Sequence, residues 1–408
     1  MTRGWKRLGL VAMAAAGVGA IAVATAAATV SRGTGTEAAT KSPVKVGIIY
    51  TRTGLLSAYG AEYIEGLRLG LEYVTHGTNT VNGHKIQLTI VDDKFDAATA
   101  VSAAKDLIGK GYKIIAGSVG SGIALSVAPL AAQNNVLFIS GPAATDAITG
   151  NNRNTFRSGR QSIQDVLAAA AFLRGQVGRK VLVLAQDSAF GQGNVAAVKA
   201  YIGGKGHNVD SILVPQSATD FTPFAQQARR ANADLLFVAW AGTTADAMWR
   251  ALDQQGVLDS TQVVTGLAER ATWSSYGDPA TARKIKFLSH YVWTAPKNKV
   301  NDWLVAKMKR RSQRPDLFTP DGFVAAQMIA RAVGKADGDD VTKMIRALEG
   351  WQFVGPKGVE RIRQQDHAMN QPMFQVQLTY PNGPTRPVAK VLKTISPAIV
   401  QPPVRPFP

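Results

Sequence analysis

Residues 44–74 read V-K-V-G-I-I-Y-T-R-T-G-L-L-S-A-Y-G-A-E-Y-I-E-G-L-R-L-G-L-E-Y-V, and the pattern of this stretch changes twice. The apolar and β-branched run over residues 44–50 predicts a buried strand. Thr, Gly and Ser then interrupt the run, and apolar residues recur at helical spacing over residues 58–74. A strand that leads through a short loop into a helix is the unit from which parallel sheets are built.

The same alternation continues on both sides of Phe156-Arg157 and forms two similar series. It predicts an α/β fold with two doubly wound, open parallel-sheet lobes joined by a multi-strand hinge. A hairpin through Pro381-Asn382-Gly383 closes the second series. Further strands are expected at residues 85–92, 113–117, 136–140, 180–185, 208–214, 234–240, 262–266, 287–293, 373–380 and 388–393, and further helices at 97–110, 123–133, 163–176, 193–205, 223–231, 244–255, 300–311, 321–335 and 341–348.

The N-terminus has the layout of an export signal. Arg3, Lys6 and Arg7 precede an uncharged run over residues 8–30, and Ala24-Thr25-Ala26 fits a signal cleavage site. We therefore expect an exported protein, with residues 1–26 as a signal peptide or an uncleaved membrane anchor. The other expected parts are a linker at 27–43, a first lobe at 44–159 plus 296–365, a second lobe at 160–295 plus 366–395, and a proline-rich tail at 396–408 that lies on the surface without packing.

Composition argues against several classes of site. The chain has no cysteine, which excludes disulfides, thiol nucleophiles and cysteine-based zinc sites. Its five histidines lie far apart, so we expect surface or structural roles for them and no metal or other cofactor. The net charge of +18 raises the question of nucleic acid, but no recognition motif accompanies the basic residues. We predict no nucleic-acid partner and a monomer.

The loops that follow the predicted strands are rich in Gly, Ser and Thr. Residues 117–122 read G-S-V-G-S-G and residues 140–145 read S-G-P-A-A-T, and each loop opens a helix or helical turn. Free amides and the helix dipole favour a carboxylate or phosphate there, whereas the alternative is that both loops are only helix caps. Tyr59 in the first lobe and the loops at 187–193 and 240–243 in the second stand at equivalent places, which suggests a small-molecule pocket with aromatic walls.

Taken together, the motifs resemble one family. The order T-G-x-x-S-A-Y-G, D-D-x-x-D, G-S-V-G-S-G, I-S-G-P-A-A-T, F-R, D-S-A-F-G-Q-G, D-F and G-P-x-G is similar to that of the leucine/isoleucine/valine-type branch of the type I periplasmic binding proteins. The resemblance runs from about residue 44 to residue 393. It implies the substrate-binding protein of an ABC importer, which closes two lobes over an amino acid, an amide or another carboxylate and then meets a membrane permease.

The resemblance also implies roles for individual residues. Ser121 and Thr145 would bind the ligand carboxylate together with backbone groups of Ala143 and Ala144, and Tyr59 would line the pocket. Glu269, one place out of register with the family pattern, is the candidate for an amine. In the second lobe, Phe190 stands where many relatives carry tyrosine, and Trp240 and Gly242 are candidates from their place after a predicted strand. The expected hinge crossings lie near residues 156–160, 292–296 and 363–370.

Two rival classes, an enzyme and a sensor, share features with a binding protein. Residues 191–196, G-Q-G-N-V-A, fit a dinucleotide-binding fingerprint, but its first glycine does not stand at the end of the preceding strand. Asp92 and Asp93 could be paired catalytic carboxylates, although a cap and a surface contact at a strand end explain them as well. No catalytic residue is therefore assigned. A ligand-sensing ectodomain shares the fold and remains the main alternative.

Overall fold

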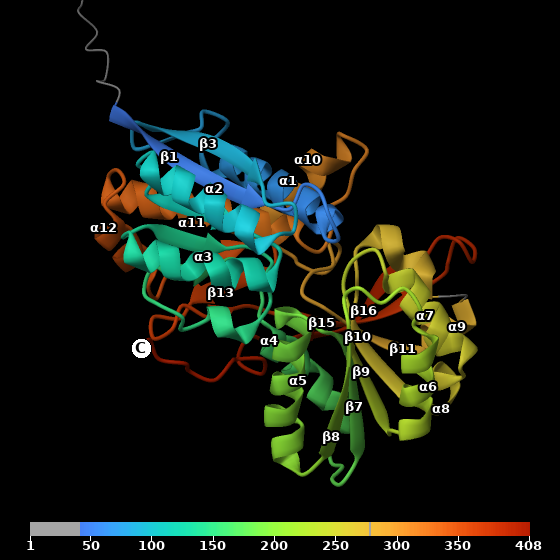
Figure 1. The fold of residues 1–408 in the computed structure, drawn as a ribbon. Coiled ribbons are helices and arrows are strands. Elements are labelled where there is room, and N and C mark those ends of the chain that lie inside the picture. Colours follow the sequence, from blue (N-terminus) through green and yellow to red (C-terminus); the bar gives the residue numbers. More distant parts are fainter. Residues whose placement is uncertain (1–40, 277–278) are drawn as a thin grey trace, which may run out of the picture. The chain divides into compact units, whose positions relative to one another are not determined.

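The computed structural model describes residues 41–276 and 279–408. A six-stranded sheet has the order β2-β3-β1-β4-β5-β6 and is parallel except at the short edge strand β2 (Figure 1). Its strands are β1 (Lys41–Tyr50), β2 (Thr80–Val81), β3 (His84–Asp92), β4 (Ile114–Gly117), β5 (Leu137–Ser140) and β6 (Thr155–Arg157).

Helices cover both faces of this sheet because its strands carry apolar side chains on both faces. Val46 and Ile48 of β1 pack in one core cluster with α1 (Ser57–Val74), α11 (Thr319–Ala336) and α12 (Val341–Leu348). Ile49 points the other way, into a cluster with α2 (Ala97–Gly109) and α3 (Ser121–Gln133). Helix α10 (Lys299–Lys309) packs with α1 and α11 through Leu304. This two-sided burial is what a doubly wound lobe requires.

The second lobe is built on a seven-stranded sheet of order β16-β15-β11-β10-β9-β7-β8. Its strands are β7 (Lys180–Gln186), β8 (Asn208–Val214), β9 (Leu235–Ala239), β10 (Gln262–Gly266), β11 (Ile285–Ser289), β15 (Met373–Thr379) and β16 (Val388–Ile395). Helices α4 (Ser162–Ala169) and α5 (Ala189–Tyr201) cover one face. The other face carries α6 (Thr222–Ala231), α7 (Ala245–Gln254), α8 (Val257–Ser260) and α9 (Pro279–Lys284).

Three connections join the two sheets. The chain crosses between β6 and α4, between β11 and α10, and after a small antiparallel sheet of β12 (Gln352–Gly355), β13 (Gly358–Ile362) and β14 (Met369–Asn370). Phe353, Ile362 and Met369 of this small sheet pack in the same cluster as β1. The α/β fold with two doubly wound lobes is thus confirmed, while the residue boundaries assigned to the lobes remain a prediction.

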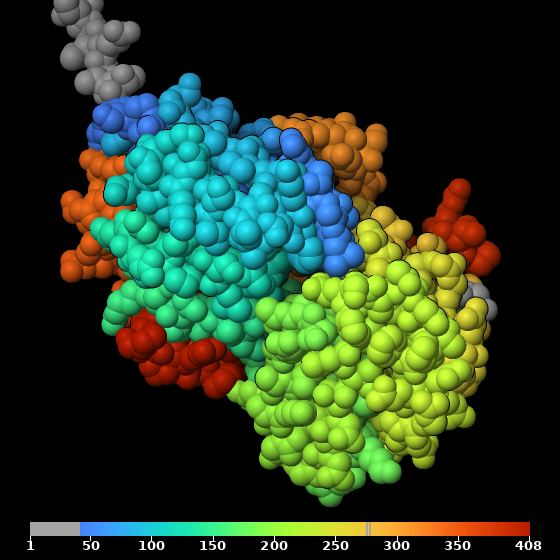
Figure 2. All heavy atoms as spheres, viewed as in Figure 1, coloured from blue at the N-terminus to red at the C-terminus, as the bar shows by residue number. Residues whose placement is uncertain are grey.

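The C-terminal tail departs from its prediction. Val400 is fully buried against the core that contains β15 and β16. The guanidinium of Arg363 donates hydrogen bonds to the carbonyls of Pro402 and Pro403, and the Arg405 amide donates to Asp366. Figure 2 shows the red end of the chain lying against neighbouring residues of the first lobe. The prediction of a tail without packing is wrong, because its prolines leave carbonyl groups free to accept these bonds.

Three smaller predictions also change. The helix expected at 163–176 ends at Ala169 and continues as a short 3-10 turn, Ala170–Leu173, and the strand expected at 287–293 begins and ends earlier, as β11. The surface contact expected of Asp93 is wrong, because that side chain is fully buried. The predicted signal peptide lies outside the described residues. Among those residues, the structure contains no helix with the length and apolarity needed to span a bilayer.

Candidate functional site

A cavity of about 250 Å³ lies where the carboxyl ends of the two sheets' strands meet. These ends are also the points where strand order reverses, at β1/β4 in the first lobe and β7/β9 in the second. Aromatic side chains from elements of both lobes line the cavity: Tyr59, Phe95 and Phe318 from the first, and Phe190, Phe237 and Trp240 from the second. The volume is slightly below the usual range for ligand pockets, about 300–1,000 Å³, and therefore suits a small molecule.

The wall from the first lobe is the N-terminus of α3. At the end of β4, Gly117 has a φ of 114°, and a side chain there would meet the Ile49 carbonyl, so only glycine fits. The buried Asp93 carboxylate accepts hydrogen bonds from Thr51 and Ser118, and the Ser118 hydroxyl accepts one from the Gly120 amide. These bonds fix the backbone that enters α3, which presents Ser121 and the neighbouring backbone to the cavity.

The free donors at this wall come from the start of the helix. The first amide of α3 that bonds within the helix is that of Ala124, which donates to the Gly120 carbonyl at 3.0 Å. The N-cap residue Gly120 has no side chain that could accept hydrogen bonds from the amides before Ala124. Two of the residues that carry these amides, Gly122 and Ile123, line the cavity. The Ser121 hydroxyl accepts a bond from the Thr145 amide at 3.2 Å, which leaves its own proton free to donate. The wall therefore suits an anion.

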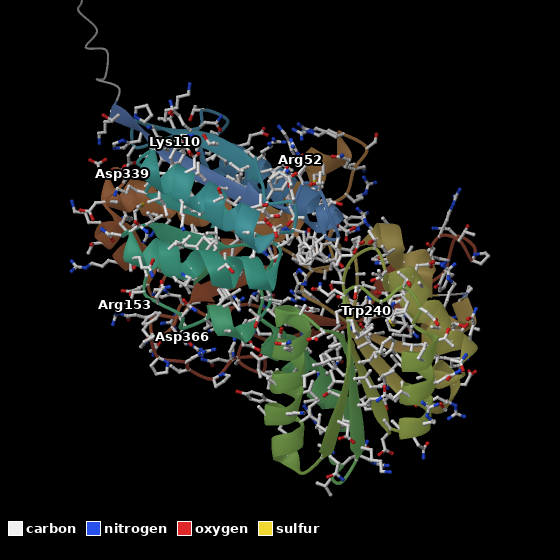
Figure 3. The ribbon with its side chains drawn as sticks, viewed as in Figure 1. Arg52, Lys110, Arg153, Trp240, Asp339 and Asp366 are labelled. Atoms are coloured by element: carbon white, nitrogen blue, oxygen red, sulfur yellow. The ribbon has the colours of Figure 1, made fainter. Side chains whose placement is uncertain are left out.

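The wall from the second lobe holds Trp240 at the end of β9 (Figure 3). The side-chain amide of Gln186 bonds to both the amide and the carbonyl of Ala241, at 3.1 Å each, and so holds the loop after this strand. The Trp240 indole donates to the Thr244 hydroxyl at 3.0 Å and packs edge-on against Phe221. The indole is thus fixed in place before any ligand enters.

Charged and titratable groups reach the cavity from the segments that cross between the lobes. Arg160 and Asp165 form a buried ion pair of 3.1 Å, and His290 lies directly after β11. Burial raises the pKa of Asp165, although the Arg160 charge opposes this. Burial, and then the positive charges of Arg160 and Lys357, hold the pKa of His290 well below its usual value.

The structure brings five of the nine predicted site residues to the cavity. Tyr59, Ser121, Ala144, Phe190 and Trp240 line it.

The other four predicted residues do not line the cavity. The Ala143 carbonyl accepts a bond from Arg157, and the Thr145 side chain faces Gly193 of the second lobe. Gly242 approaches the Leu55 carbonyl so closely that a side chain there would collide with it. Glu269 is buried near Tyr59, whose pKa is raised by burial and then by the Glu269 charge. The binding roles of all nine residues remain predictions.

Sequence reasoning missed Arg160, Asp165, His290, Phe95 and Phe318 as residues of the cavity. The predicted site residues lie in or near loops at the carboxyl ends of strands, whereas Arg160, Asp165 and His290 belong to crossing segments or their flanks. The sequence did place the first crossing at residues 156–160, so attention to polar residues in the predicted hinge could have found Arg160.

The rival sites find no support in the described residues. No cluster of His, Cys, Asp or Glu within 41–276 and 279–408 has the composition of a metal site. The glycine fingerprint falls inside α5, where Gly191 permits close packing on the Gln186 carbonyl of β7. Asp92 accepts bonds from the backbone amides of Arg52, Thr53 and Lys94, as a loop cap does.

A family model described as periplasmic binding protein matches residues 43–384. The chain belongs to the periplasmic binding protein family. This match covers both lobes and the cavity between them, and it confirms the family resemblance drawn from the motifs.

Known relatives agree with the family assignment. The chain is 26% identical over 318 residues to a Leu/Ile/Val-binding protein homologue of Brucella melitensis, covering 77% of this chain and 85% of the relative. A solved structure, that of an ABC-type branched-chain amino acid transporter from Rhodopseudomonas palustris, is 32% identical with a TM-score of 0.74, covering 90% of this chain and all of the other. Another Rhodopseudomonas palustris structure, of an ABC transporter solute-binding protein in complex with 3,4-dihydroxybenzoic acid, is 25% identical with a TM-score of 0.76, covering 87% and 97%.

This periplasmic binding protein is therefore a solute-binding protein of the type that serves ABC transporters. Members of such a family act outside the cytoplasmic membrane, which agrees with the predicted export.

Proposed function

We propose that this protein captures a small carboxylic acid with an apolar or aromatic body and delivers it to the permease of an ABC importer. The observation that carries the proposal is the joint lining of one cavity by the N-terminus of α3 and by aromatic side chains from both lobes. An anion at the helix start and an apolar body between aromatic rings use both kinds of wall.

The same geometry supports a hinge mechanism. Ligand contacts that come from both lobes exist together only when the lobes are closed, so the ligand favours the closed state by its differential affinity. The closed protein is then the form that a permease recognises. The ligand leaves unchanged, since binding and release require no bond to form or break.

The amine of an amino acid is a weaker fit than an aromatic or aliphatic acid. Glu269, the residue expected to bind an amine, does not line the cavity. Asp165 does line it, but the positive charge of Arg160 beside its carboxylate disfavours a second cation there. Relatives are named for branched-chain amino acids and one neighbour was solved with a hydroxylated benzoic acid, so both classes belong in the test.

The test compares matched ligands by isothermal titration calorimetry. Benzoate and leucine present a carboxylate, whereas benzamide keeps the ring of benzoate without the charge. We expect a carboxylate to bind and benzamide to bind at least about tenfold more weakly. Ser121→Ala should weaken carboxylate binding by about tenfold, because it removes one hydroxyl donor. Equal affinity for benzoate and benzamide, or no binding of any carboxylate, would overturn the proposal.

A further inference from the structure

Three buried arginines stand at the crossings between the two sheets, and their hydrogen bonding differs. The Arg157 guanidinium donates to the Thr149 hydroxyl and to the carbonyls of Ala143 and Thr145.

Arg363 uses all three nitrogens of its guanidinium. Its guanidinium binds Asp366 through two nitrogens and also donates to the carbonyls of Pro402 and Pro403. Both of these arginines hold protein segments together through their terminal nitrogens, as structural arginines do.

Arg160 is different. Only its Nε donates a hydrogen bond, to Asp165 Oδ2 at 3.1 Å, and its terminal nitrogens donate none among residues 41–276 and 279–408. The Oδ1 atom of Asp165 accepts none there either, and both side chains line the cavity. Both residues are largely buried, with exposed fractions of 9% for Arg160 and 6% for Asp165.

Some other polar side chains of the cavity wall already have hydrogen-bond partners within the protein. Both ends of the Gln186 amide bond to Ala241, and the Asn194 amide donates to Ser162 and Phe190. The pair of Arg160 and Asp165 is therefore the charged group of this wall that still offers both a donor and an acceptor to a ligand.

We propose that Arg160 and Asp165 recognise a hydroxyl group of the ligand. A hydroxyl accepts a bond from a terminal nitrogen of Arg160 and donates its proton to Asp165 Oδ1, so one neutral group satisfies both. A second carboxylate would satisfy Arg160 but would face the charge of Asp165. The inference rests on the proposed function and narrows its ligand class to hydroxylated carboxylic acids.

The experiment measures the benefit of a ligand hydroxyl in the wild type and in variants of the pair. The probes are benzoate and its 2-, 3- and 4-hydroxy derivatives, titrated by calorimetry. We expect at least one hydroxybenzoate to bind about tenfold or more tightly than benzoate. In Asp165→Asn and in Arg160→Gln this ratio should fall toward one, because each change replaces a charge-assisted hydrogen bond with a weaker neutral one.

Control variants separate recognition from folding. Arg179→Gln breaks an exposed ion pair with Asp234 in the second lobe, and the hydroxyl preference should survive it. Arg160→Gln combined with Asp165→Asn removes both buried charges, so it provides a folded comparison if a single variant leaves the other charge unpaired.

Each outcome has a defined meaning. A wild type that binds benzoate without preferring any hydroxy derivative overturns the inference and leaves the proposed function intact. A preference that persists in both single variants also overturns it. Failure of every acid to bind overturns the proposed function itself and the inference with it. If both single variants lose the preference for a hydroxybenzoate and keep their affinity for benzoate, the inference is supported.

Discussion

Glu360 offers the sharpest test of how charge is buried in this fold. Its side chain on β13 is fully buried, and neither carboxylate oxygen has a well-formed hydrogen bond within the described residues. Burial, with a smaller contribution from the Asp321 charge, raises the pKa of Glu360 from its ordinary 4.5 to about 7, against the opposing charge of Lys357. The perturbation is Glu360→Gln, which keeps the shape and removes the titration.

The magnitude follows from the two pKa values. Because the folded pKa of Glu360 lies above the unfolded one, the folded state holds a proton that the unfolded state has lost between pH 4.5 and about 7. The stabilisation that this proton provides is fully present below pH 4.5 and is lost as the pH rises to about 7. The total corresponds to about 3 kcal/mol, of which about 2 kcal/mol is lost between pH 5 and pH 7.5.

The assay is urea unfolding followed by tryptophan fluorescence at several pH values from 5 to 7.5. The wild type should lose about 2 kcal/mol more unfolding free energy over this range than Glu360→Gln. Asp339→Asn, which removes an exposed carboxylate between α11 and α12, should follow the wild type (Figure 3). Parallel pH profiles for the wild type and Glu360→Gln would refute the reasoning.

Three further predictions concern lobe closure and the tail. A Cβ atom at Gly193 of α5 would lie 2.8 Å from the Thr145 hydroxyl of the first lobe. Gly193→Ala should therefore weaken ligand binding, although alanine favours a helix more than glycine does. Adding Thr145→Ala removes this hydroxyl and should restore ligand binding. Arg270 forms an ion pair of 3.1 Å with Asp316 across the lobes. Arg270→Ala should therefore lower ligand affinity by up to about tenfold. It should also reduce the compaction that small-angle scattering shows when ligand is added. Val400→Ala should cost about 1–2 kcal/mol of unfolding free energy in urea, whereas an unchanged midpoint would mean that the tail does not pack.

The fold was predictable because its determinants are local. The strands of both sheets are buried on two faces, so they appear as continuous apolar runs, and the helices between them carry clear amphipathic spacing. Strand β8, for example, was predicted with the bounds that the structure shows. The small sheet of β12, β13 and β14 was not predicted, because its short strands alternate weakly and it forms only when Phe353, Ile362 and Met369 pack on the first lobe.

The cavity was predictable only in part, for a physical reason. A strand end followed by Gly and Ser marks the anion-binding end of α3, which is a local feature. Whether a buried arginine is free to bind a ligand depends on partners far away in sequence. The Arg363 guanidinium donates to the carbonyls of Pro402 and Pro403 in the C-terminal tail. The terminal nitrogens of Arg160 meet no such carbonyl in the described residues.

The crossings themselves share one charged centre, and this limits how the lobes can move. The Lys357 ammonium donates to Asp321 and to Gln371 beside the third crossing, and Asp321 packs against Gly159 of the first. The other carboxylate oxygen of Asp321 lies 3.8 Å from His290 on the second crossing, and His290 lines the cavity. A fully buried ion pair keeps its geometry because separating its charges there is costly. Closure should therefore bend the crossings on either side of this centre and leave the centre in place.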